Sequence, residues 1–418
     1  MGVKNMKKNN LKIKNARLVE TDKTADILVL DGIIADICRG DYQSPVKKDF
    51  KDFAEHEIID ACGNYISPGF IDLHVHLRDP GFKHKEDIES GTKAAVNGGI
   101  TTVCCMPNTN PCIDNPDLIK YIREHNAYCH VLPVGAITKS QKGEELTDFA
   151  ALKKAGAVAL SDDGKPVEND NLMREALIKA KENGILIMSH CEDLTLSGNE
   201  AEDKITKRDI DLACETNARL HICHVSSGKS ADYIAGAKKR GYNITAETCP
   251  HYFVLTDADV LKYGVNARMN PPLRSSEDRE KIIEAIKSGV IDCISTDHAP
   301  HSDDEKKAGL NGINGLETSF ALGVTYLVKQ NHITLAKLIE LMAVNPAKII
   351  GIDGKYGTIE VGKSADFVIF NTDEKFIYDK NKSYSRSRNT PFHGFELYGK
   401  ILWTVVGGNV VCDLSTIK

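Results

Sequence analysis

The sequence has no apolar stretch approaching the roughly 18 consecutive residues that a membrane-spanning helix requires. It also has no long run of like charges, and its formal net charge is only −6, so neither a nucleic-acid-binding tail nor a membrane-surface helix is expected. No apolar segment follows the lysine-rich start, so we do not expect a secretory signal. Because none of the 12 cysteines forms a Cys-x-x-Cys pair, we expect reduced thiols and a cytoplasmic protein.

The overall composition is that of an ordinary globular protein, with 41% hydrophobic and 27% charged residues. The chain has 418 residues, which is enough for a large core. A single (β/α)8 barrel takes about 250 residues, so the length leaves room for a second, smaller domain.

The central part of the chain repeats one pattern: a short apolar run, a polar or glycine-rich corner and a longer helical stretch. Buried runs that alternate with helices indicate a parallel sheet covered on both faces, and eight such runs favour a closed, TIM-like (β/α)8 barrel. An open doubly wound sheet is the alternative, although no Gly-x-Gly-x-x-Gly corner supports its dinucleotide-binding form. The runs are 65–77, 100–106, 130–137, 157–160, 185–189, 220–225, 242–247 and 291–296.

The two ends of the chain depart from this pattern, since residues 9–66 and 356–418 both contain short strand-like runs and turns. Two all-β ends around one barrel can pair into a single small β-sandwich domain. We therefore predict an α/β protein in three parts: residues 1–66 and 346–418 form the two halves of the small β domain, and residues 67–345 form the barrel.

The strongest local motif is Asp72-Leu73-His74-Val75-His76-Leu77-Arg78. Alternate residues of a strand point to the same side, so His74 and His76 share a face and can hold one metal ion between them. Arg78 follows just beyond them. A His-x-His pair alone is weak evidence, because a solvent-facing pair of histidines has the same spacing.

Ligand-type residues also end several other predicted strands, on the side where barrel enzymes build their active sites. Because the fold brings these tips together, a metal centre is favoured over unrelated surface residues. His221 and His224 face opposite sides of their strand, and His224, nearer the tip, is the expected ligand. Asp162 and Asp163 also face opposite sides, and the pattern does not choose between them. The tips are Ser161-Asp162-Asp163, Ser189-His190, Cys223-His224 and Thr296-Asp297-His298.

The chemistry of these side chains suits zinc, with iron, manganese and cobalt as alternatives. Six ligands exceed what one tetrahedral ion uses, so a pair of ions bridged by a carboxylate is expected.

As a set, these motifs resemble those of bacterial class I dihydroorotases, a group within the amidohydrolase superfamily, in the same order over most of the chain. Further segments carry the resemblance: Met106-Pro107-Asn108-Thr109, Asn270-Pro271-Pro272-Leu273-Arg274, Gly315-Leu316-Glu317-Thr318 and Asn389-Thr390-Pro391-Phe392-His393-Gly394.

The resemblance implies zinc-dependent, reversible cyclisation of N-carbamoyl-L-aspartate to L-dihydroorotate in pyrimidine (UMP) biosynthesis. It implies one zinc ion on His74, His76 and Asp297, a second on His190 and His224, and a bridge through Asp163, with Asp162 as the fallback. Asp297 is also the expected catalytic base, and no carbamylated lysine is expected. Substrate contacts are implied for His76, Arg78, Asn108, Asn270, His301, Asn311 and Gly312.

Several expectations accompany this resemblance. The partner is a small-molecule substrate rather than nucleic acid or membrane, and the chain is expected to form a homodimer and to associate with aspartate carbamoyltransferase. Residues 302–314 form either a mobile lid or a solvated loop. The segment between His190 and His224 is shorter than in typical relatives, which bears on access to the site. Alternative functions are a hydantoinase, dihydropyrimidinase or allantoinase, whose substrates lack the carboxylate that Arg78 would bind, or an inactive scaffold.

Overall fold

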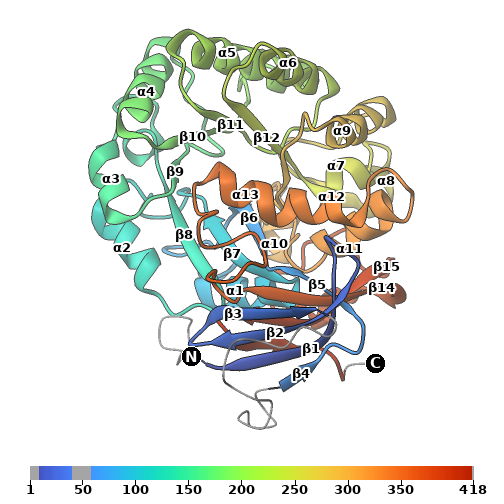
Figure 1. The fold of residues 1–418 in the computed structure, drawn as a ribbon. Coiled ribbons are helices and arrows are strands. Elements are labelled where there is room, and N and C mark those ends of the chain that lie inside the picture. The colour runs from blue at the N-terminus through green and yellow to red at the C-terminus, as the bar shows by residue number, and fades with distance from the viewer. Residues whose placement is uncertain (1–8, 40–57, 417–418) are drawn as a thin grey trace.

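The computed structural model describes residues 9–39 and 58–416 and has two parts, a helix-covered barrel and a small β-sheet packed on its side (Figure 1). Eight parallel strands form the barrel, each hydrogen bonded to the next in chain order. A bridge between Val75 of β6 and His298, which follows β13, closes the ring of strands, so the (β/α)8 prediction is confirmed. The strands are β6 (Phe70–Val75), β7 (Ile100–Cys105), β8 (His130–Gly135), β9 (Ala159–Leu160), β10 (Leu186–Ser189), β11 (Leu220–Ile222), β12 (Ile244–Thr248) and β13 (Cys293–Ile294).

Helices cover the outside of the barrel, and local sequence sets several of their ends (Figure 1). The first helix begins after Asp87, whose carboxylate accepts from the backbone N–H of Ser90 in a capping box. The fourth ends at Gly184, which has the left-handed φ of 60° that glycine tolerates. The main helices are α1 (Ile88–Asn97), α2 (Pro116–Glu124), α3 (Phe149–Ala155), α4 (Asp170–Asn183), α5 (Asn199–Thr216), α6 (Gly228–Lys239) and α9 (Ser276–Ser288).

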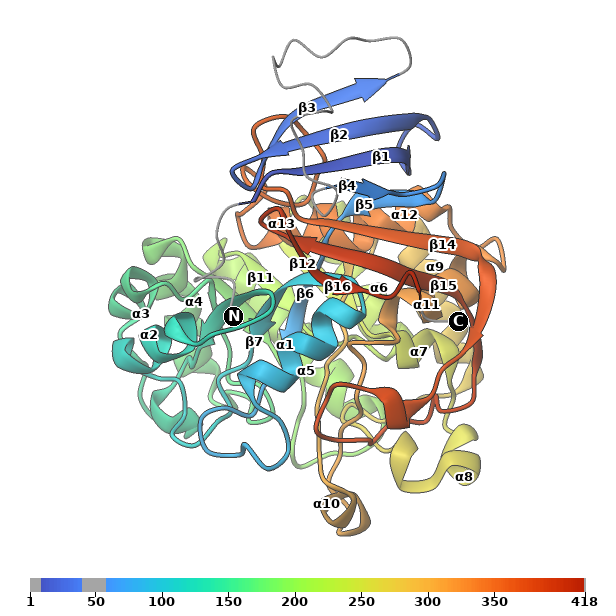
Figure 2. The same ribbon diagram turned by 90° about the horizontal axis from the view of Figure 1, so that it is seen from below.

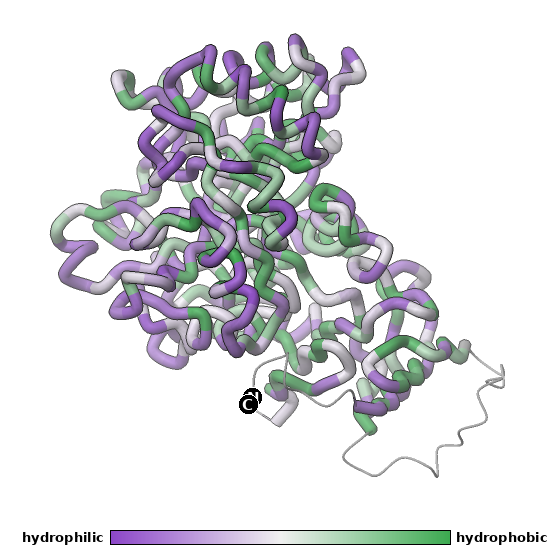
Figure 3. The backbone as a smooth tube through the Cα atoms, turned by 90° about the vertical axis from the view of Figure 1, so that its left-hand side faces the viewer, coloured by the Kyte–Doolittle hydropathy of each residue, from purple (hydrophilic) through white to green (hydrophobic). Residues whose placement is uncertain are grey.

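Six shorter helices complete the barrel layer: α7 (Pro250–Val254), α8 (Asp259–Tyr263), α10 (Asp303–Lys307), α11 (Ser319–Gly323), α12 (Leu335–Ile339) and α13 (Asn345–Ile349). Hydrophilic and hydrophobic stretches alternate along the peripheral helical turns, as expected of helices with one face on the barrel (Figure 3). Within the described ranges, no helix is both long and apolar enough to cross a membrane.

The small sheet combines strands from both ends of the chain, as the sequence predicts; blue and red strands lie side by side in Figure 1. The strand β5 joins the halves, since it pairs with β1 on one side and with β14 on the other. All the strands belong to one continuous sheet, which curls so that Ile33 bridges to Ser364 around a core of its own. The strands are β1 (Leu11–Leu18), β2 (Thr24–Leu30), β3 (Ile33–Arg39), β4 (Ile58–Asp60), β5 (Tyr65–Pro68), β14 (Phe367–Ile377), β15 (Glu396–Val406) and β16 (Asn409–Asp413).

The first predicted barrel run, residues 65–77, is two strands rather than one. Its first part is β5 of the small sheet, and its second part is β6 of the barrel. The chain passes from one to the other at Gly69, where a side chain would begin 2.2 Å from the side chain of Thr101. Because the apolar run continues across this point, hydrophobic pattern alone does not reveal the change of sheet.

The connection between β14 and β15 leaves the small sheet altogether. In Figure 2 this red segment, residues 378–395, extends away from the sheet and along the barrel toward α10. We call its part from Ser383 to Asn389 the C-terminal strap. The strap brings the C-terminal part of the chain to the end of the barrel where the candidate site lies.

Candidate metal centre

The two histidines of the His-x-His motif lie at the end of β6 with their ring centroids 5.4 Å apart. The Nε2 atom of His76 is 3.0 Å from Oδ1 of Asp297, and that of His74 is 3.7 Å from the same oxygen. All three side chains are buried. Their ligand atoms form one compact group, the same three residues that the resemblance assigns to one ion.

Asp163 occupies the middle of the cluster. Burial alone would raise the pKa of its carboxyl group, but the surrounding histidines, His74 first, lower that pKa well below its usual range. The carboxylate is therefore ionised and faces imidazoles on several sides, as a bridging ligand would. Its Oδ1 is 3.3 Å from His74 Nε2, 3.3 Å from His190 Nδ1 and 3.5 Å from His224 Nε2, and its Oδ2 is 3.5 Å from His76 Nε2.

Asp162 points away from this cluster. Its carboxylate accepts hydrogen bonds from the backbone N–H groups of Ile137 and Thr138, at 2.8 and 3.1 Å, and from the Thr138 hydroxyl. Burial raises the pKa of Asp162 to about 6. Of the two aspartates between which the sequence does not choose, Asp163 lies among the histidines, and Asp162 accepts hydrogen bonds from the loop after β8.

Two atoms at the centre of the cluster are buried without a hydrogen-bond partner: Nε2 of His74 and Oδ1 of Asp163. Buried polar atoms are rarely left unsatisfied unless a ligand completes them. Imidazole nitrogens and carboxylate oxygens that converge in this way are the donor set of zinc and similar divalent ions. The residues present therefore fit a metal centre.

The ring nitrogens that face away from the cluster are also held in place. His74 Nδ1 donates to Glu247 at 2.8 Å, His76 Nδ1 to Asn108 at 2.8 Å and His190 Nε2 to Glu192 at 2.9 Å. Such contacts fix the tautomer and the orientation of a metal-binding imidazole. Neither Glu192 nor Glu247 is assigned a role from the sequence, although Glu247 ends the seventh predicted strand and its position at a tip is a usable signal.

Glu247 is a fully buried carboxylate. Burial alone would raise its pKa, but His221 and then His74 lower it below its usual range, so it is ionised. It also accepts from the Ser295 hydroxyl at 2.5 Å. His221 lies 3.3 Å from Glu247 and outside the ligand cluster. This position agrees with the prediction that His221 and His224 face opposite sides of their strand.

We expect Glu247→Gln to weaken metal binding about 10- to 100-fold, because a neutral amide no longer raises the basicity of His74. Competition with a chromophoric chelator measures the affinity, and Glu200→Gln, an exposed change on α5, is the control. Equal affinities in the two variants would contradict this role.

Arg78 follows the metal-ligand strand with a φ of 57°, a conformation uncommon outside glycine and often found at functional sites. Its guanidinium donates to the Pro300 carbonyl at 3.3 Å and lies 3.2 Å from Nε2 of His301. Burial lowers the pKa of Arg78. Burial, followed by Arg78 and Lys85, lowers the pKa of His301 to about 3, so this imidazole is neutral. Within the described ranges no carboxylate forms an ion pair with Arg78.

The remaining predicted substrate residues are placed unequally. Asn108 contacts His76 and also donates to Asp163 at 3.2 Å. Asn270 donates to Glu192 at 2.9 Å, and these two side chains border a cavity of about 220 Å³ beside the segment that follows β10. Asn311 is exposed, and its side chain has no described contact with the cluster.

The loop of residues 302–314 is anchored rather than simply solvated. The ammonium group of Lys306, which is 2% exposed, donates to the carbonyls of Arg268, Leu310 and Gly312 at 2.8, 2.9 and 2.8 Å. Gly312 packs so closely on His301 that a side chain there would begin 3.0 Å from the imidazole. Of the two predicted positions in this loop, only Gly312 lies against another predicted substrate residue.

The profile of the amidohydrolase family matches residues 65–411, and the chain belongs to this family. It is a metal-dependent cyclic amidohydrolase. Relatives named dihydroorotase are 46% identical in Acetivibrio thermocellus, over 96% of this chain and 98% of that protein, and 45% identical in Clostridioides difficile, over 96% and 99%. A solved L-hydantoinase (dihydropyrimidinase) from Arthrobacter aurescens superposes with a TM-score of 0.88 at 27% identity, over 98% of this chain and 96% of that one.

Proposed function

We propose that this enzyme is a dihydroorotase, which interconverts N-carbamoyl-L-aspartate and L-dihydroorotate in pyrimidine biosynthesis. The named relatives support this activity. The observation that carries the choice of substrate is the guanidinium of Arg78. It lies beside the ligand cluster and forms an ion pair with no described carboxylate. A planar guanidinium can bind a carboxylate through two parallel hydrogen bonds. Dihydroorotate has such a group on its ring, whereas hydantoin and dihydrouracil do not.

The proposal includes two zinc ions. His74, His76 and Asp297 would hold one, His190 and His224 the other, and Asp163 would bridge them. The support is the convergence of six ligand side chains and the two unsatisfied buried atoms. When bound, such a pair acidifies water and polarises a carbonyl group. The resemblance to dihydroorotases that bridge through aspartate further supports a centre without a carbamylated lysine.

In this mechanism the protein orients the substrate and moves one proton. Arg78 and the neutral His301 hold the carboxylate, with the ring amide turned toward the ligand cluster. Asp297, whose Oδ1 faces that cluster, accepts a proton from the attacking water. It returns this proton to the ring nitrogen as the amide bond breaks. Cyclisation of N-carbamoyl-L-aspartate follows the same path in reverse.

Turnover before and after chelation tests the activity directly. We expect the purified enzyme to hydrolyse dihydroorotate, to lose this activity with the metal and to regain it with added zinc, while hydantoin and dihydrouracil react far more slowly. Preference for hydantoin or dihydrouracil would favour the alternative functions, and metal-free, inactive protein would favour the scaffold.

Arg78→Ala should raise the KM for dihydroorotate about 100-fold, because a charged, two-point hydrogen bond to the substrate is lost. The value of kcat should change much less, and steady-state kinetics separates the two. Arg78→Lys, which keeps the charge but not the fork, should fall between wild type and Arg78→Ala. An unchanged KM in Arg78→Ala would remove Arg78 from substrate binding.

The proposal extends to the setting of the enzyme, a homodimer in the cytoplasm that associates with aspartate carbamoyltransferase. These points are supported by the resemblance alone. Analytical ultracentrifugation of the purified protein, with and without that transferase, tests both assemblies.

A further inference from the structure

The motif Asn389-Thr390-Pro391-Phe392 has no part in the chemistry derived so far, yet the structure brings Asn389 to the substrate side of the site. The residue ends the C-terminal strap, and its side chain is 1% exposed. The connection that contains it extends away from the small sheet to which the flanking strands β14 and β15 belong (Figure 2).

The side chain of Asn389 joins two segments that carry predicted substrate contacts. Its Oδ1 accepts from the backbone N–H of His301 at 3.2 Å. Its Nδ2 donates to the carbonyls of Ala299 and Gly312, both at 3.0 Å. One amide therefore fixes the backbone on both sides of the contact between Gly312 and the His301 ring. The backbone carbonyl of Asn389 accepts from the N–H of Asn314 at 2.8 Å, so a further hydrogen bond holds the loop two residues beyond Gly312.

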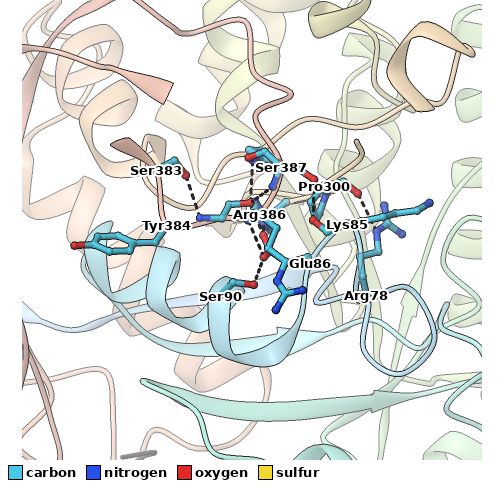
Figure 4. Close-up of polar contacts among 12 residues, drawn as sticks. Arg78, Lys85, Glu86, Ser90, Pro300, Ser383, Tyr384, Arg386 and Ser387 are labelled. Atoms are coloured by element: carbon cyan, nitrogen blue, oxygen red, sulfur yellow. Dashed lines mark hydrogen bonds and ion pairs between the residues drawn. The ribbon is translucent and has the colours of Figure 1, made fainter. Parts of the chain in front are cut away.

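The strap is itself held against the loop that follows Arg78 (Figure 4). The Ser387 hydroxyl donates to the carbonyl of Lys85 at 2.7 Å, and the Arg386 N–H donates to Glu86 at 3.1 Å. The Ser385 hydroxyl also donates to Glu86. These contacts fix where Asn389 stands relative to the chain segment that bears Arg78.

Glu86 connects the strap to the metal side as well. Its fully buried carboxylate lies 3.2 Å from Nε2 of His298, the residue after Asp297. The carbonyl of His298 accepts from the N–H of His76 at 2.9 Å. The strap therefore contacts two loops that carry predicted substrate-binding groups. It meets the loop after Arg78 at Glu86, and it meets residues 299–314 through Asn389.

We propose that Asn389 is a positioning residue for the substrate pocket: it holds His301 and Gly312 in the arrangement that receives the substrate carboxylate beside Arg78. This inference rests on the proposed function, since that function makes His301 and Gly312 substrate contacts. The C-terminal strap is then a working part of the active site rather than a link between two strands.

Two variants separate the two arms of the Asn389 side chain. Asn389→Ala removes both arms. Asn389→Asp keeps an acceptor for the His301 N–H but sets a carboxylate against the carbonyls of Ala299 and Gly312. The matched control is Asn381→Ala, in the same connection, where the asparagine is exposed and, among the described residues, its side chain bonds only to Asp379.

Hydrogen–deuterium exchange measures how well the backbone amides around Asn389 are protected, and it needs no substrate. In Asn389→Ala we expect faster exchange of the His301 amide, which loses its acceptor, and of the Asn314 amide, because the segment before it is no longer held at the Gly312 carbonyl, with the barrel strands unchanged. In Asn389→Asp the His301 amide should stay protected while Asn314 exchanges faster. Exchange across residues 299–314 that matches the Asn381→Ala control in both variants would overturn the proposal.

Kinetics then shows whether the ordering serves the substrate. Asn389→Ala should raise the KM for dihydroorotate about tenfold, the equivalent of roughly one hydrogen bond, with kcat and metal content close to wild type. A merely structural role would lower thermal stability and leave KM unchanged, which would also overturn the proposal. If Asn389→Ala does not fold, Asn389→Ser takes its place. Should wild type fail to turn over dihydroorotate, the proposed function falls, while the exchange data still decide whether Asn389 orders this segment.

Discussion

Asp297→Asn should reduce the turnover of dihydroorotate about 10³-fold or more while the protein stays folded, because an amide cannot accept the proton that Asp297 is proposed to move. The carboxylate stands 3.0 Å from His76 within the ligand cluster, so the loss is expected mainly in kcat. Steady-state kinetics with dihydroorotate and with N-carbamoyl-L-aspartate should show the same loss in both directions, since one residue serves both.

Metal analysis of the same preparation separates proton transfer from metal binding. Circular dichroism checks that the variant is folded, and Asp304→Asn, an exposed change on α10, provides the matched control. Near-normal turnover in Asp297→Asn would exclude Asp297 as the base. Loss of metal in parallel with activity would instead assign the effect to its role as a ligand.

The adjacent carboxylates Asp162 and Asp163 should give opposite results when each is replaced by alanine. Asp163→Ala should lose metal affinity by more than the ~10- to 100-fold typical of residues that only orient a ligand, and activity should disappear with the metal. Asp162→Ala should retain the metal but lose about 1–3 kcal/mol of folding stability, because the N–H groups of Ile137 and Thr138 lose their acceptor.

Metal content and urea unfolding of the metal-free proteins measure the two effects separately. Metal-free protein is required because bound metal itself stabilises the native state. Metal loss in Asp162→Ala together with full occupancy in Asp163→Ala would exchange the two assignments.

Much of the fold and of the ligand cluster could be predicted from the sequence because both follow from periodic backbone geometry. The period of two along a strand places His74 and His76 on one face, and the ends of parallel strands meet at one end of a barrel. The same period places Asp162 and Asp163 on opposite sides of their strand, but it does not say which side faces the histidines. Which of the two side chains faces the histidines depends on the contact of Asp162 with Thr138, and therefore on a loop conformation.

Other features could not be predicted because they depend on contacts between distant segments. The change of sheet at Gly69 lies within an unbroken apolar run, and only its approach to Thr101 explains it. Glu247 and Asn389 both lie in segments that stand out in the sequence. Their proposed roles depend on contacts with distant segments: Glu247 accepts from His74, and Asn389 donates to the carbonyls of Ala299 and Gly312.

The small sheet is completed by residues at opposite ends of the chain: Asn64 and Asn371, 307 positions apart, are hydrogen bonded across it. Synthesis on the ribosome proceeds from the N-terminus, so β5 is made before the whole barrel while its partner β14 is made after it. The strap arrives later still. A truncated chain that ends before the strap keeps every histidine of the cluster but lacks Asn389 and its contacts with His301 and Gly312, so we expect it to lack the complete substrate pocket.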